Sequence, residues 1–253
     1  MRVMRDSDPT LHPGAPSWSW AGGSAQAVLP PTVTTGNPDL KPITGNNFDL
    51  SLDYDLPHSG LIHLGAFDKE FNNYVVGRSV FGAFSGVPGT PFITSFVNAP
   101  SSHARAAEAA FAQTLWFLPG PLAGFGVSGN VTFVDSDIEL RTGEHQLLPA
   151  TSKFTGNAAL FYSGHGLEVQ LAVQDVGESL STIGASPLTD VYQTRRITMD
   201  LTSSLALRRN VQIYFNAKNL LNTPLRFNEG RSDRPIQREF YDVTLETGVR
   251  AQF

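Results

Sequence analysis

The sequence contains no cysteine, so it offers neither a disulfide framework nor a thiolate for a metal site or a nucleophile. It also lacks any run of eighteen apolar residues, which excludes a transmembrane helix. Charged residues make up only 16% of the chain, against about 25% in ordinary soluble domains. The net charge of −5 leaves no basic stripe for phosphates, so we expect no nucleic-acid partner. Residues 1–8 do not resemble a signal peptide.

Patterns that carry catalysis or hold metals are also missing. No G-x-S-x-G nucleophile motif is present, so we expect no catalytic residue and no enzyme activity. Asp135, Asp137 and Glu139 offer oxygen ligands for Ca²⁺ but lack the glycine-turn spacing of a calcium loop; we interpret them as a solvated strand end. The histidines show no H-x-x-x-H spacing: His12, His58, His63, His103, His145 and His165. We therefore expect no metal and no cofactor.

What the sequence does contain is alternation, most clearly in its last fifteen residues, Glu239 to Phe253. Every second residue belongs to a largely apolar series: Tyr241, Val243, Leu245, Thr247, Val249, Ala251 and Phe253. The residues between them are polar or small. A period of two predicts a strand. Fifteen residues are long for a globular strand but suit a tilted strand that crosses an outer membrane.

The same alternation recurs along the chain and predicts about nine strands. The clearest segments are 48–56, 125–133, 167–174, 196–207 and 211–218, and less regular strands are expected near 61–76, 106–118 and 153–162. Short turns near 57–60, 119–124, 163–166 and 207–210 alternate with long connections near 77–105, 140–152, 177–194 and 222–237. Outer-membrane barrels alternate tight turns and long loops in this way. A soluble β-sandwich that binds carbohydrate remains the alternative.

Several segments resemble the C-terminal half of TonB-dependent outer-membrane receptors. They are Asn37–Pro42 with Asn47–Leu50, Phe67–Phe71, Leu118–Val127 with Asn130–Thr132, Asn219–Asn222, and Arg234–Tyr241 with the terminal Phe253. They occur in the family's order, and the third is similar to a hairpin of the large Xanthomonas and Caulobacter receptors. Ile43 and Asp242 depart from the pattern, where the family often has Glu and Gly.

The resemblance implies a 22-stranded barrel around an N-terminal plug, whereas this chain holds about nine strands. We therefore expect an all-β, antiparallel transmembrane β-barrel segment of about nine meander strands, which is open without the missing N-terminal strands and plug. Residues 37–253 would be the C-terminal part of the barrel, and the Pro-rich residues 1–36 an irregular leader. Alone, the segment would not transport.

The implied function is energy-coupled uptake of a scarce solute across the Gram-negative outer membrane. An oligosaccharide is favoured and an iron–siderophore complex is second. Expected partners are outer-membrane lipid, the solute, the TonB complex through the missing plug, and the barrel-assembly machinery, for which Phe253 would be the signal.

Two groups of loop residues are candidates for contact with the solute. Tyr74, Phe81 and Phe84 offer rings that stack on sugars or a siderophore, or that pack within the loop or at the membrane interface. Arg226, Arg231 and Arg234 belong to the most charged loop. They would bind solute at the extracellular mouth, pair with the plug, or form an inward salt-bridge network.

Overall fold

The computed structural model describes residues 30–141 and 143–252. It contains fifteen strands: β1 (Thr32–Thr34), β2 (Thr44–Leu56), β3 (Gly60–Phe81), β4 (Phe92–Thr114), β5 (Phe125–Arg141), β6 (Glu144–Gln146), β7 (Phe154–Gly164), β8 (Leu167–Val176), β9 (Ser179–Thr182), β10 (Val191–Gln193), β11 (Arg196–Arg208), β12 (Val211–Lys218), β13 (Leu225–Glu229), β14 (Pro235–Glu239) and β15 (Thr244–Ala251). Two short 3₁₀ helices, η1 (Gly120–Gly124) and η2 (Pro187–Thr189), complete the described part. Phe253 and the first 29 residues of the expected leader lie outside it.

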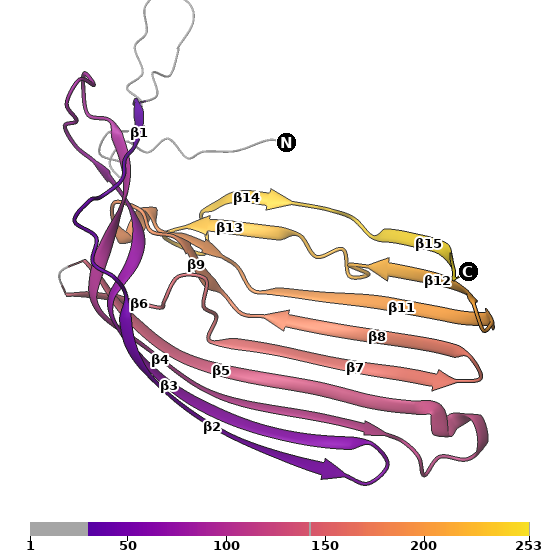
Figure 1. Ribbon diagram of the computed structural model, residues 1–253. Helices are drawn as coiled ribbons and strands as arrows, with labels where there is room; N and C mark the ends of the chain where they lie inside the picture. The colour runs from indigo at the N-terminus through magenta and orange to yellow at the C-terminus, as the bar shows by residue number, and fades with distance from the viewer. Residues whose placement is uncertain (1–29, 142, 253) are drawn as a thin grey trace, which may run out of the picture.

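Nine strands form one antiparallel meander in the order β15-β12-β11-β8-β7-β5-β4-β3-β2. The sheet curves into an open trough whose two edges are β2 and β15 (Figure 1). The expected open meander of about nine strands is therefore confirmed. β1 pairs with β4 in parallel and β6 pairs with β5 at one end of the trough. β1 falls within the segment that was expected to be irregular.

The two faces of the trough differ because side chains alternate along each strand. The outer face exposes large apolar side chains, among them Leu50 at 77% and Val249 at 68%. Aromatic pairs border its central part. Phe125 and Tyr162 lie 5.0 Å apart between ring centroids near one end, and Phe133 and Phe154 lie 5.3 Å apart near the other. This apolar band with aromatic borders has the surface of a transmembrane barrel.

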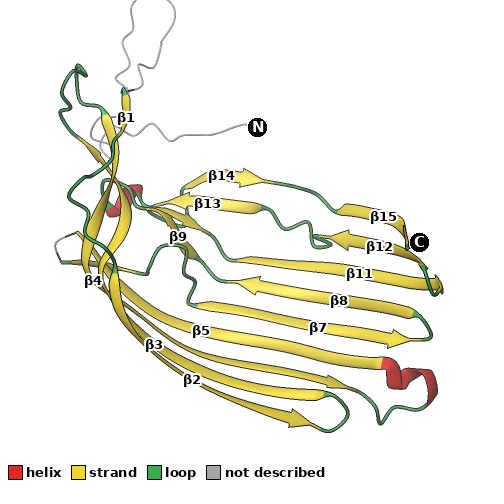
Figure 2. Ribbon diagram, in the orientation of Figure 1, coloured by secondary structure: helices red, strands yellow, loops and turns green. Residues whose placement is uncertain are grey.

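The two ends of the trough carry different connections. Residues 57–59, 165–166 and 209–210 are tight turns at one end, which also carries η1 and is called the turn end here (Figure 2). The longer connections lie at the opposite, loop end. In the described part of the chain, no helix is long and apolar enough to cross a membrane. The alternation of short turns and long connections is confirmed, with corrected boundaries.

The predicted connection 77–105 is wrong in its extent. β3 and β4 pair continuously from Leu61↔Ala112 to Phe81↔Phe92, so that only residues 82–91 connect them. The far part of this hairpin rises above the trough at the upper left of Figure 1. Its strands contain small residues such as Gly77 and Ser101, which pair through the backbone but give no apolar alternation. Such residues hide a strand from a search for periodicity.

The prediction of one strand from Glu239 to Phe253 is also wrong at its start. Glu239 ends β14, which belongs to a second sheet, and β15 begins only at Thr244. Between them the chain turns at Asp242, whose φ of 55° is left-handed. β12, the partner of β15, ends at Lys218 beside Asn219, which donates a side-chain hydrogen bond of 3.2 Å to the Asp242 carbonyl.

The connections predicted as loops at 177–194 and 222–237 fold into a four-stranded sheet, β14-β13-β10-β9. Near it lies the buried core of the described chain, formed by Val76, Ala99, Ala104, Ile138, Leu148, Leu180 and Ile183. The core therefore sits at the loop end, whereas the apolar outer face of the trough is uncovered. A β-sandwich would cover its apolar faces with each other, so this arrangement does not favour the soluble alternative.

Candidate functional site

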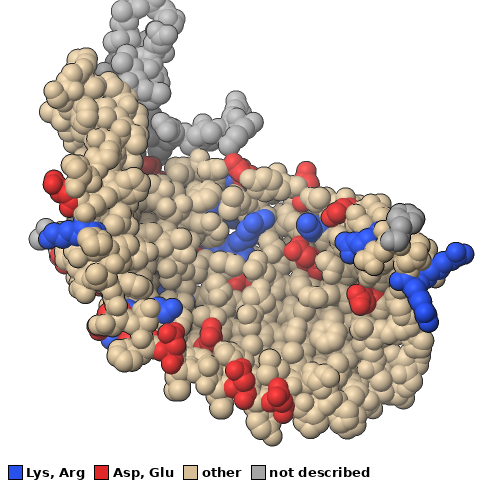
Figure 3. Space-filling view, in the orientation of Figure 1, with Lys and Arg blue, Asp and Glu red and all other residues tan. Residues whose placement is uncertain are grey.

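The concave face of the trough is polar across its width. On β2, Asp49, Asp53 and Asp55 alternate with the exposed apolar residues of the outer face. Figure 3 shows acidic side chains along this edge and charges of both signs over the upper strands of the view, amid a mostly uncharged surface. A wall of this kind faces water or polar protein, because polar groups turned toward hydrocarbon are costly.

His63 joins three neighbouring strands on this face. Its Nδ1 lies 2.7 Å from Asp53 Oδ1, and its Nε2 lies 3.3 Å from Glu108 Oε1. Gly65 lies beside Glu108 on the same face, where a Cβ would come within 2.6 Å of the Glu108 carboxylate. The missing side chain gives Glu108 the room to reach His63. The spacing of the histidines in the sequence does not indicate this contact, because Asp53 and Glu108 lie on two other strands.

A groove of about 460 Å³ lies on the concave face near the turn end. Its walls come from β7, β8, β11, β12 and β15, and its lining includes Phe161, Glu168, Gln170, Thr202, Ser204, Gln212, Tyr214, Asn216, Glu246 and Arg250. The lining mixes carboxylates, amides, hydroxyls and two aromatic rings. None of these residues was singled out from the sequence, because they belong to five separate strands and only the register brings them together.

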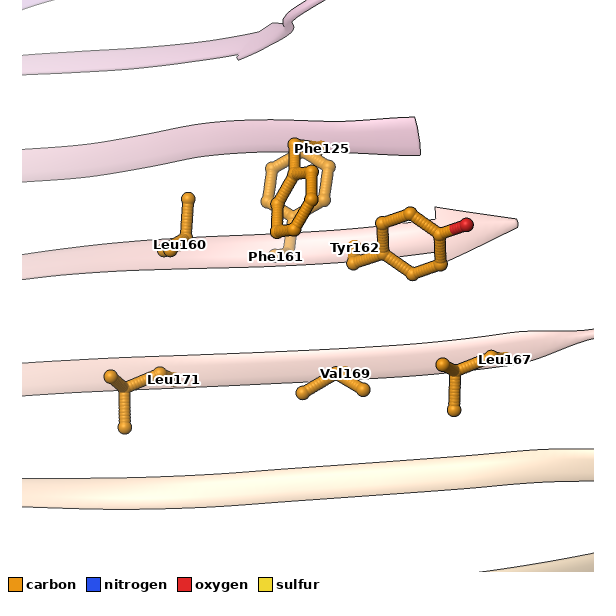
Figure 4. A pocket seen from close by; sticks show the side chains of 7 residues that line it. All are labelled: Phe125, Leu160, Phe161, Tyr162, Leu167, Val169 and Leu171. Carbon is orange, nitrogen blue, oxygen red and sulfur yellow. The ribbon is translucent and has the colours of Figure 1, made fainter. Parts of the chain in front are cut away.

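A second hollow, of about 310 Å³, lies over β5, β7 and β8 and is almost wholly apolar. Figure 4 shows Phe125, Leu160, Tyr162, Leu167, Val169 and Leu171 around it, together with Phe161 from the opposite face of β7. The first six belong to the apolar outer face by their register. This hollow is therefore a gap between side chains of the membrane-facing surface rather than a solute site.

The structure does not bring the three predicted aromatic residues together. Tyr74 packs against the buried core at the base of the β3–β4 hairpin. Phe81 lies seven residues further along β3, about 23 Å away along an extended strand, where its ring is 5.0 Å from that of Phe92. Phe84 forms a bridge with Val87 in the connection at the tip. Tyr74 thus supports the loop-end fold, and Phe81 and Phe84 lie far above the trough.

The three predicted arginines lie on the β13–β14 hairpin. Arg226 is exposed on β13, and Arg231 is exposed in the turn, where it contacts Asp233 at 2.9 Å. Arg234 is only 12% exposed and lies 3.5 Å from the Glu229 carboxylate. Arg226 and Arg231 are thus accessible from outside, while Arg234 is held within the hairpin.

The acids once considered as calcium ligands lie on β5. The Asp137 carboxylate lies 2.8 Å from His145 Nδ1, and this hydrogen bond raises the pKa of His145. Glu139 accepts a hydrogen bond of 3.1 Å from the Gly143 amide. Within residues 30–141 and 143–252, no group of acids and histidines is arranged to hold a metal ion.

A different acid, Asp190, anchors the loop-end sheet. Asp190 is fully buried, and its Oδ1 accepts a hydrogen bond of 2.7 Å from the Gly184 amide. Its own carbonyl accepts one of 2.7 Å from the amide of Gly230, which directly follows β13 and has a φ of 66°. Glycine tolerates that conformation, and a Cβ there would meet the Leu188 backbone at 2.4 Å.

The open meander, its apolar outer face and its polar concave face define a segment of a transmembrane β-barrel. The family model described as TonB dependent receptor-like, beta-barrel, matches residues 9–220. Because the match takes in most of the chain, the chain belongs to this family, whose members are transporters of the Gram-negative outer membrane and not enzymes. The comparison with curated proteins found no match.

Solved structures share the fold at low sequence identity. The ferric enterobactin receptor PfeA of Pseudomonas aeruginosa (mutant G324V) is 18% identical, with a TM-score of 0.61 over 87% of this chain and 32% of that chain. The siderophore receptor PirA of Acinetobacter baumannii is 16% identical, with a TM-score of 0.61 over 87% and 33%. The copper transporter OprC is 13% identical, with a TM-score of 0.62 over 88% and 34%. The chain thus spans about a third of their length.

Proposed function

We propose that residues 37–253 form the C-terminal part of the barrel of a receptor that takes up a scarce solute across the outer membrane. Residues 1–36 would be a leader, and the barrel-assembly machinery would recognise Phe253. The observation that carries the proposal is the nine-stranded trough, apolar outside and polar inside. It corresponds to about a third of each solved receptor. Uptake would draw energy from the TonB complex through a plug region, and this segment alone would not transport.

An oligosaccharide is the favoured solute, with an iron–siderophore complex second. The support for a sugar is the resemblance of Leu118–Thr132 to a hairpin of the Xanthomonas and Caulobacter receptors. Phe81 and Phe84 at the hairpin tip, and the exposed Arg226 and Arg231, would meet the solute from outside. For Tyr74 and Arg234, which are packed within the loop-end structure, we propose a supporting role beneath these contacts.

Deletion of the gene in its own host tests the proposal. The deletion strain would be grown on single oligosaccharides as carbon source, and separately on iron-limited medium with single siderophores. Loss of growth on an oligosaccharide, restored by the gene, supports the favoured solute. Loss of growth only under iron limitation would show that the solute is an iron–siderophore complex instead. Unchanged uptake of every solute in both series refutes a transport role.

A further inference from the structure

The apolar hollow on the outer face lies where closure of a barrel would leave it open to lipid. Its walls come from β5, β7 and β8, and β7 is the middle strand of the nine-stranded sheet. Strands added at the two edges of the trough would therefore close a barrel without covering this hollow, which is called the outer hollow below. A hollow on this face meets the hydrocarbon of the membrane.

The outer hollow exists because a row of short side chains lies between two rows of leucine. Val169 pairs with Tyr162 on one side and with Ser203 on the other. The neighbouring rows carry leucines: Leu160, Leu171 and Leu201 toward the loop end, and Leu167 and Leu205 toward the turn end. Ser203 donates a hydrogen bond of 2.9 Å to the Phe215 carbonyl, so its hydroxyl leaves no unmet polar group in the lipid.

Tyr162 gives the outer hollow a polar border toward the turn end. Its ring packs over two glycines, because a Cβ on Gly124 or on Gly164 would come within 2.8 Å of its atoms. Figure 4 shows its hydroxyl directed toward the end of β7, where it lies 3.4 Å from His165 Nδ1. Tyrosine is enriched at this depth of a membrane, because its ring meets hydrocarbon while its hydroxyl meets the headgroups.

Two consecutive arginines lie beside this border. Arg208 ends β11 and Arg209 lies in the turn to β12, and both are exposed. Arg208 pairs with Val211 of the apolar outer series, so the register places it on the outer face. This turn adjoins the turn between β7 and β8, since the Ala206 amide donates a hydrogen bond of 2.8 Å to the Gly166 carbonyl. Figure 3 shows basic side chains at this end, at the right of the view.

The charge at this border is complementary to an anion. The described turns at 165–166 and 209–210 contain no carboxylate. Glu168, the acid next to Leu167 on β8, belongs to the concave face, where Ser204 donates a hydrogen bond of 3.4 Å to it. A guanidinium binds a phosphate through two parallel hydrogen bonds. An anionic headgroup at this height would therefore meet Arg208 and Arg209 while its acyl chain fills the outer hollow.

We propose that the outer hollow and the two arginines form a binding site for one phospholipid with an anionic headgroup. An acyl chain lies over Val169 between the rows of leucine. Arg208 and Arg209 bind the phosphate, with the Tyr162 hydroxyl beside it. Outer-membrane barrels have their tight turns in the periplasm, so the lipid belongs to the periplasmic leaflet. The site does not depend on which solute the receptor takes up, and it goes beyond the proposed function.

Native mass spectrometry of the full chain tests the site. The chain would be folded in nanodiscs of phosphatidylethanolamine with a graded fraction of phosphatidylglycerol that has the same acyl chains, and the retained lipid would be counted in mild detergent. We expect the wild type to retain one phosphatidylglycerol in preference to phosphatidylethanolamine. Arg208→Gln and Arg209→Gln should each weaken this binding roughly fivefold. Lys41→Gln and Arg78→Gln, at exposed positions of the loop end, are the matched controls and should bind as the wild type does.

The same substitution at two positions of β8 tests the seat of the acyl chain. Val169→Phe fills the outer hollow and excludes about two methylene groups, so phosphatidylglycerol binding should fall roughly tenfold. Val173→Phe adds the same ring to the same face outside the lining of the hollow and should leave binding unchanged. Heat-modifiable gel mobility shows that each variant is folded.

Equal retention of the two phospholipids by the wild type would overturn the site, and so would equal binding by the arginine variants and their loop-end controls. Equal affinity of Val169→Phe and Val173→Phe would contradict the seat of the acyl chain in the outer hollow. Solute uptake, measured in the deletion strain, is a separate readout, so the lipid site and the proposed function can fail independently.

Discussion

A charge placed in the middle of the outer face should prevent stable membrane insertion, and Val173 is the position to choose. Val173 pairs with Ala158, which pairs with Gly129, midway between the aromatic borders at Phe125 and Phe133. Those borders are eight residues apart, or about 26 Å along the strand and about 20 Å vertically at the usual tilt. Arginine near the midplane costs roughly 2 to 4 kcal/mol, a roughly thirtyfold to thousandfold shift in the folding equilibrium.

The neighbouring residue supplies the control, because Gln174 is exposed on the concave face. Val173→Arg and Gln174→Arg differ by one position and add the same side chain. The yield of heat-modifiable protein in the outer-membrane fraction, and the urea midpoint for folding into lipid vesicles, should fall strongly for Val173→Arg and little for Gln174→Arg. Equal losses for the two variants would refute the assignment of the two faces.

Three further outcomes follow from the loop end and the terminus. Deletion of Phe253 should reduce outer-membrane assembly in pulse-labelled cells, whereas an unchanged assembly rate would end its role as a signal. In an NMR titration, the pKa of His145 should lie above its ordinary value in the wild type and return toward that value in Asp137→Asn. Because the folded-state pKa is raised, the His145–Asp137 pair contributes its full stability at a pH below the ordinary pKa of histidine. This contribution is lost as the pH rises through the raised pKa. Asp190→Ala should cost about 1 to 3 kcal/mol by leaving a buried amide without its acceptor; faster hydrogen exchange in β9 and β10, not seen in Asp233→Ala on the exposed turn, would confirm it.

Strands are predicted best from the sequence where one of their faces meets lipid. Along β8, Leu167, Val169, Leu171 and Val173 are apolar, because hydrocarbon tolerates few polar side chains. Of the residues that alternate with them, Glu168, Gln170 and Gln174 are polar and only Ala172 is not. The strand count and the turn-end connections followed from this alternation. The β3–β4 hairpin beyond the trough escaped it because no lipid selects its residues, and small side chains such as Ala99 and Ser102 are packed there instead.

The candidate site was less predictable because its parts are remote in sequence. Phe161 and Tyr214 come together only through the register of β7, β8, β11 and β12. Gly126 lies beneath the Phe161 ring and Gly248 beneath the Tyr214 ring, and the missing side chains make room for the two rings. In the sequence, these glycines only interrupt the alternation of apolar and polar residues. A signal was present in the sequence, namely an aromatic residue on the polar series of a strand opposite a glycine. Its use requires the pairing of strands, which periodicity alone does not provide.

The parity of the sheet restricts what can close it. β2 and β15 are the first and ninth strands of an antiparallel meander, so both run from the loop end to the turn end. If β15 paired directly with the β2 of a second copy, the two strands would be parallel, and bacterial outer-membrane barrels are antiparallel throughout. A complement of this trough must therefore add an odd number of strands, and the first and last of these must run from the turn end to the loop end, opposite to β15 and β2. A second copy in the same orientation adds nine strands, but its edge strands run the same way as β15 and β2, so both seams would be parallel. Two copies of the trough joined edge to edge therefore do not close an antiparallel barrel.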